Sequence, residues 1–74
     1  MTNDIKKLKE VAKEFKKFKE WGYNTNEAAQ NALDTVLASE HKYIYKNEHN
    51  EASHIFINGY VLFFRGGIYK NINH

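Results

Sequence analysis

The hydrophobic pattern of this 74-residue chain changes its period once, near residue 41, and that change limits the folds open to it. Before residue 41, apolar residues recur every three or four positions, the spacing that lines one face of an α-helix. After it, β-branched and aromatic residues alternate or run together between turn residues, as they do in strands. Helices followed by strands predict an α+β fold with an antiparallel sheet.

The first helical segment is expected over about residues 4–21. Asn3 or Asp4 can cap its start, and Gly22 can end it in a left-handed conformation. The apolar residues form one continuous stripe along the helix: Ile5, Leu8, Val11, Ala12, Phe15, Phe18 and Trp21.

A second helix is expected over about residues 26–39. Asn24 or Thr25 can serve as its N-cap, with Glu27 in its first turn. Its apolar stripe contains three alanines, which let a neighbouring helix approach closely: Ala28, Ala29, Ala32, Leu33, Val36 and Leu37. The connection between the helices is short, so we expect an antiparallel helix hairpin over about 4–39.

The second half of the chain predicts a small antiparallel sheet of three to four strands over about residues 42–72. The expected strands are 42–46, 54–57, 60–64 and 68–72. Asn58-Gly59 between two apolar runs indicates a type I′ hairpin turn, because this turn needs a positive φ at both positions. The predicted order is α-α-β-β-β-β in a single domain, residues 1–74.

A two-residue turn also predicts the register of the hairpin, and directly opposed residues share a sheet face. One face would carry Ile55, Ile57, Tyr60, Leu62 and Phe64, and the other His54, Phe56, Val61 and Phe63. Both faces are apolar, although two helices can cover only one. We expect Ile55, Ile57 and Leu62 to pack on the helices, because aliphatic side chains fit an alanine-rich stripe.

The second apolar face leaves two interpretations open: the sheet curls or a terminal segment covers it, or it contacts another chain. Tyrosine is enriched at protein interfaces, which favours contact with another chain. The predicted partner-binding residues are Phe56, Val61, Phe63, Tyr43, Tyr45 and Tyr69. The expected partner is a larger host protein or a second copy of the chain in a homodimer.

Lysines on the polar side of the first helix suggest an alternative function, a nucleic-acid-binding regulator. Contacts to phosphate or to an acidic surface would come from Lys6, Lys9, Lys13, Lys16, Lys17 and Arg65. Glutamates are interspersed among these lysines, and residues 24–40 carry a charge of −3. This pattern favours a solvated helix face, so nucleic acid is expected to bind only weakly.

Enzymatic and metal-binding functions have little support in the sequence. The chain has no cysteine and four dispersed histidines, so no disulfide, metal ligand set or cofactor is expected. No catalytic motif occurs, and we expect no enzyme activity. A minimal ribonuclease-type toxin, with His54 as base beside Tyr60 or Glu51, is the remote third hypothesis.

Composition suggests where the protein works. No apolar stretch could span a membrane and no signal peptide is evident, so a cytoplasmic protein is expected. Ten lysines against one arginine, with many Asn, Ile, Tyr and Phe residues, suggest an AT-rich gene. The sequence therefore predicts a small protein-binding inhibitor or regulator of a larger protein, as in the anti-defence proteins of a phage or mobile element of a low-GC bacterium.

Overall fold

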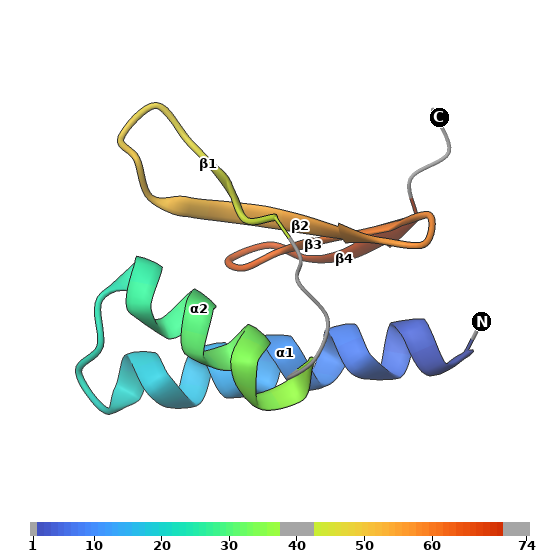
Figure 1. The fold of residues 1–74 in the computed structure, drawn as a ribbon, viewed down its shortest axis with the longest axis horizontal. Helices are drawn as coiled ribbons and strands as arrows, with labels where there is room; N and C mark the ends of the chain where they lie inside the picture. Colours follow the sequence, from blue (N-terminus) through green and yellow to red (C-terminus); the bar gives the residue numbers. More distant parts are fainter. Residues whose placement is uncertain (1, 38–42, 71–74) are drawn as a thin grey trace.

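The computed structural model describes residues 2–37 and 43–70, which form two layers (Figure 1). One layer holds helices α1 (Thr2–Glu20) and α2 (Thr25–Val36). The other is an antiparallel sheet in which the strands follow their order in the chain: β1 (Tyr45–Lys46), β2 (Ala52–Ile57), β3 (Tyr60–Phe63) and β4 (Gly67–Lys70). The predicted α+β fold, a helix hairpin followed by a small antiparallel sheet, is confirmed.

Helix α1 differs from its prediction at both ends. It begins at Thr2, so Asn3 and Asp4 lie inside its first turn and the predicted cap is wrong. Gly22 has a φ of 101°, the left-handed conformation expected after the helix. The spacing places Trp21 in the apolar stripe, but this residue follows the end of α1 at Glu20 and is 64% exposed, with its ring edge-on to Phe18 at 5.4 Å.

Asn24, one of the two predicted N-caps, caps the start of helix α2. The backbone N–H of Glu27 donates to Oδ1 of Asn24 at 2.8 Å, which satisfies one of the free amides of the first turn. The helix ends at Val36, before the expected end at residue 39, and residues 38–42 lie outside the described part of the chain. Its alanines at positions 28, 29 and 32 are fully buried, and they let α1 and α2 pack closely.

The central hairpin has the predicted register, with Ile57 opposite Tyr60 and His54 opposite Phe63. Asn58 and Gly59 have φ values of 44° and 89°, as a type I′ turn requires. The first strand is shorter than predicted, and β4 begins one residue earlier than predicted, at Gly67. Strand β1 holds only two residues and has an irregular register with β2, and residues 71–72 of the last predicted strand lie outside the described residues.

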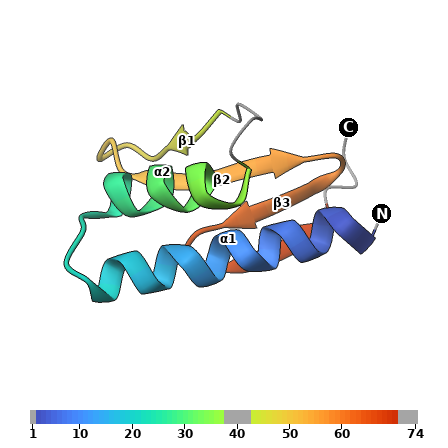
Figure 2. The ribbon, with the colours of Figure 1, turned by 60° about the horizontal axis from the view of Figure 1, so that its bottom comes forward.

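The core lies between the helices and the sheet face predicted to meet them. Helix α1 contacts β3 and β4, and α2 contacts β2 (Figure 2). Ile55, Ile57 and Leu62 are 0–4% exposed within this core, which confirms the choice of inner face. The rings of Phe15 and Phe64 lie 5.0 Å apart and join α1 to the end of β3. In the described part of the chain, no helix or strand covers the opposite face of the sheet (Figure 1).

Candidate protein-binding face

The sheet face that points away from the helices is lined by aromatic side chains from all four strands. The register places Tyr45 opposite His54, His54 opposite Phe63, and Val61 between Phe56 and Tyr69. Tyr43 joins the set through its contact with Tyr45. We call this set the aromatic face: Tyr43, Tyr45, His54, Phe56, Val61, Phe63 and Tyr69.

The rings of the aromatic face form one continuous cluster centred on His54. Its imidazole stacks on Tyr45 with centroids 4.9 Å apart and planes 1° apart. Phe56 stands edge-on to both rings at 5.2 and 5.4 Å. Phe63 lies 5.2 Å from His54 on one side and 5.9 Å from Tyr69 on the other. Each ring is therefore held by its neighbours, and the surface they form is pre-organised.

Most side chains of the aromatic face are exposed to solvent. Phe56 and Phe63 are 39% and 38% exposed, and Tyr43 is 73% exposed. Val61 differs, since it is only 8% exposed between two larger neighbours. Val61 fills the space between the rings of Phe56 and Tyr69, and its contact with a partner stays a prediction.

The aromatic face is uncharged at its described strand positions. Lys46 lies opposite Ala52 and Lys70 opposite Tyr60, so the register directs both lysines to the helix side of the sheet. Two polar groups of the face already have partners in the chain. The Tyr69 hydroxyl donates to the carbonyl of Gly66 at 3.3 Å, and Nδ1 of His54 lies 3.1 Å from the Ser53 hydroxyl.

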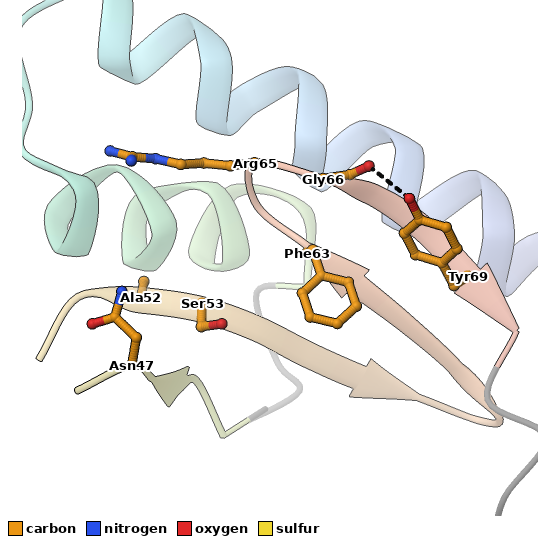
Figure 3. Close-up of a pocket in the computed structure, with 7 residues that line it drawn as sticks. All are labelled: Asn47, Ala52, Ser53, Phe63, Arg65, Gly66 and Tyr69. Atoms are coloured by element: carbon orange, nitrogen blue, oxygen red, sulfur yellow. Dashed lines mark hydrogen bonds between the residues drawn. The ribbon is translucent and has the colours of Figure 1, made fainter. Parts of the chain in front are cut away.

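One end of the aromatic face is hollowed. An open pocket of about 460 Å³ lies between the β1–β2 loop and the β3–β4 turn, beside the rings of Phe63 and Tyr69. Figure 3 draws the residues that line it. Arg65 also lines this pocket, but its side chain extends away from the two rings toward the start of α2 (Figure 3). There its guanidinium donates to the Thr25 hydroxyl at 3.3 Å. The pocket therefore presents aromatic surface to solvent, with its one cationic group drawn to the side.

The lysines proposed as an alternative contact surface are all exposed on α1, on the layer opposite the aromatic face. One of them is engaged within the helix: the Lys17 ammonium lies 2.8 Å from Glu14 and within 6 Å of the Phe18 and Trp21 rings. Arg65 does not contact these lysines and bonds instead to Thr25 of α2. Its partner Thr25 is shared instead with Lys19, whose ammonium lies 3.3 Å from the same hydroxyl.

The groups named in the ribonuclease hypothesis are not brought together. Tyr60 packs against the core on the inner face, whereas His54 lies on the aromatic face. Glu51 is exposed in the loop before β2. Among residues 2–37 and 43–70, no three His, Cys, Asp or Glu side chains are grouped to hold a metal ion. His41 and His74 lie outside this range.

Asn26 holds one end of the site in place and is not predicted by any pattern in the sequence. Asn26, in the first turn of α2, accepts a hydrogen bond from the Ala52 backbone N–H at 2.7 Å and donates to the Asn50 carbonyl at 3.0 Å. This side chain therefore fixes the start of β2 against the helix layer. No local sequence pattern predicts these hydrogen bonds, because the partners of Asn26 are 24 and 26 residues away in the chain.

Comparison with known protein families, with curated proteins and with solved structures finds no match to this chain. No helix within the described residues is long and apolar enough to cross a lipid bilayer.

Proposed function

We propose that this chain is a small, non-enzymatic protein-binding module that docks on another protein through its aromatic face and thereby inhibits or regulates it. The observation that carries the proposal is the continuous ring cluster, which crosses four strands and is open to solvent. Contiguous apolar patches on the surface of a small protein often mark interaction sites, and aromatic residues are enriched at the centre of protein interfaces.

Charge favours a protein over a nucleic acid as the ligand of this face. Proteins that stack bases on aromatic rings also supply cations that follow the phosphate backbone. Here the strand lysines Lys46 and Lys70 are directed to the helix side, and Arg65 extends toward α2. The exposed lysines of α1 belong to the helix layer, on the other side of the sheet from the aromatic face, so they do not border the rings on which bases would stack.

The proposal also covers the origin of the protein and the place where it acts. The AT-rich residue usage and the small size support an origin in a phage or mobile element of a low-GC bacterium. A module of this kind would act in the cytoplasm by blocking a surface of a larger host protein, which is the manner of action of an anti-defence protein. The mechanism we propose is steric blockade, because the aromatic face is apolar and uncharged at its described strand positions.

An affinity capture with two matched variants tests the proposal. Phe56→Glu adds a carboxylate to the aromatic face, and Thr35→Glu adds the same group to an exposed position on α2. We expect wild type and Thr35→Glu to retain the same protein from a lysate of the host cell, and Phe56→Glu to lose it while its circular dichroism stays native. Capture that is equal in all three, or that disappears after nuclease treatment, would contradict the proposal.

A further inference from the structure

We infer that, when no larger partner is bound, the aromatic face packs against the same face of a second copy and forms a symmetric dimer. This inference rests on the proposed function, because both assign contact to the same surface. It names the occupant of that surface in the isolated protein. The dimer would have four layers, with two sheets in the middle and a helix hairpin on each outer side.

The absence of charge on the face is the first argument for a second copy. In a two-fold symmetric interface residue i contacts residue j and j contacts i, so a group near the axis meets its own counterpart and any charge elsewhere needs an opposite charge on the same face to pair with. The described strand positions of the aromatic face carry no carboxylate, ammonium or guanidinium group. A surface of this kind can meet itself without repulsion.

Two polar groups on the face, the Tyr69 hydroxyl and Nδ1 of His54, give a second argument. Burying a hydroxyl or imidazole costs free energy unless it is hydrogen-bonded. The Tyr69 hydroxyl already donates to Gly66, and the His54 ring already contacts the Ser53 hydroxyl. These contacts lie within one chain, so they survive when a second aromatic surface covers them.

The lysines of α1 lie where they repel the lysines of a second copy least. Each copy carries a formal charge of +2, and its lysine row lies on α1, on the far side of the sheet. Face-to-face packing of two sheets about 10 Å apart, with a helix layer of about 10 Å outside each, separates the two rows by about 30 Å. That distance is about three Debye lengths at ~0.1 M salt, so the repulsion between the rows is largely screened.

The available area sets the strength of the dimer. The five exposed rings, which are 38–73% exposed, present together about 500 Å² if a whole aromatic side chain offers about 200 Å². Two copies would bury about 1,000 Å², which reaches the lower limit for a specific interface but not the usual ~1,600 Å². The dimer should therefore be weak and in exchange with the monomer, and a partner that buries more area would displace the second copy.

Sedimentation equilibrium of the full chain tests the inference, at concentrations from about 10 µM to about 1 mM, where interfaces of this size dissociate. We expect the average mass of wild type to rise from 8.7 kDa toward twice that value. Phe63→Glu should stay at the monomer mass across the range, and Thr35→Glu should behave as wild type. Tyr69→Glu, at a more exposed position near the edge of the sheet, provides a second test if Phe63→Glu does not fold.

Each other outcome overturns the dimer. A wild-type mass of 8.7 kDa at every concentration would do so, as would a dimer that persists in a folded Phe63→Glu or Tyr69→Glu variant. Assemblies heavier than a dimer would also overturn it, because a two-fold contact closes on itself. A strictly monomeric wild type that still captures its partner through Phe56 would refute this inference and leave the proposed function standing, so the two failures are distinguishable.

Discussion

Tyr45 and His54 lie face to face across the β1–β2 pair, with ring centroids 4.9 Å apart and ring planes 1° apart. Strand β1 has only two residues and lies at the edge of the sheet, so few backbone hydrogen bonds hold it. The stack is therefore a principal contact of this edge strand with the rest of the sheet. It also fixes the ring at the centre of the aromatic face.

Replacing His54 by Ala should loosen β1 more than it destabilises the whole domain. Aromatic pairs contribute about 0.5–1.5 kcal/mol beyond the area they bury, and His54 contacts three rings. We expect faster hydrogen exchange at the Tyr45 and Lys46 amides, with the amides of the β2–β3 hairpin largely unchanged. Uniform acceleration across the sheet would show that the stack supports the global fold instead.

Adjacent residues of β3 should respond in opposite ways to the same charge. Leu62 is fully buried beneath the helices, whereas Phe63 is 38% exposed on the aromatic face. An unpaired carboxylate at position 62 would cost several kcal/mol in a domain whose total stability is about 5 kcal/mol, so Leu62→Glu should unfold the chain. Phe63→Glu should keep native circular dichroism and a cooperative thermal transition. Equal unfolding of both variants would place Phe63 in the core.

Asn26 should contribute more to stability than its surface position suggests. Asn26→Ala leaves the Ala52 backbone N–H without its acceptor, at a cost of about 1–3 kcal/mol. Asn26→Asp keeps an acceptor for that N–H and loses only the donation to Asn50, so it should be less destabilising. Urea unfolding of the two variants measures this order. An Asn26→Ala midpoint equal to that of wild type would mean that water replaces the side chain.

The Asn58-Gly59 turn should tolerate glycine and resist alanine. Gly59 has a φ of 89°, which a residue with a Cβ adopts only at a cost of about 1–2 kcal/mol. Gly59→Ala should lower the free energy of unfolding by about that amount, although no atom lies within 4 Å of the added Cβ. Asn58→Gly, at a φ of 44°, should leave it nearly unchanged. A neutral Gly59→Ala would indicate that the turn changes its type without loss.

Nucleic acid should bind weakly and without sequence preference. The α1 lysines are exposed but share their helix with glutamates, and Lys17 already contacts Glu14 at 2.8 Å. We expect dissociation constants of about 10⁻⁴–10⁻⁶ M for duplex DNA or RNA, weakening steeply as salt rises. Fluorescence anisotropy at several salt concentrations measures this. A sequence-dependent complex that survives physiological salt with submicromolar affinity would revive the nucleic-acid hypothesis.

Much of the fold could be predicted because local rules determine it. The Asn58-Gly59 turn fixes the hairpin register, and that register in turn assigns residues 54–57 and 60–63 to a face. The choice of the inner face followed from matching aliphatic side chains to an alanine-rich helix. These inferences needed only short-range geometry and a count of the surfaces that two helices can cover.

Other features depended on contacts between distant residues and could not be predicted. Asn26 forms hydrogen bonds with backbone groups of Asn50 and Ala52, and no periodic pattern in the sequence predicts them. Trp21 fits the spacing of the apolar stripe, but the end of α1 leaves it exposed. Val61 alternates with the aromatic residues of its strand, yet only the packing of its neighbours shows that it is covered.

The order of the strands has a consequence for how the chain folds. Every strand pairs only with its neighbour in sequence, and the two helices are joined by a short turn. Most native contacts therefore join residues close in the chain, which lowers the contact order and the entropy lost in closing loops. A domain with this topology is expected to fold on the order of milliseconds, without a populated intermediate. Folding at this rate leaves the apolar inner face of the sheet exposed to solvent only briefly in a newly synthesised copy.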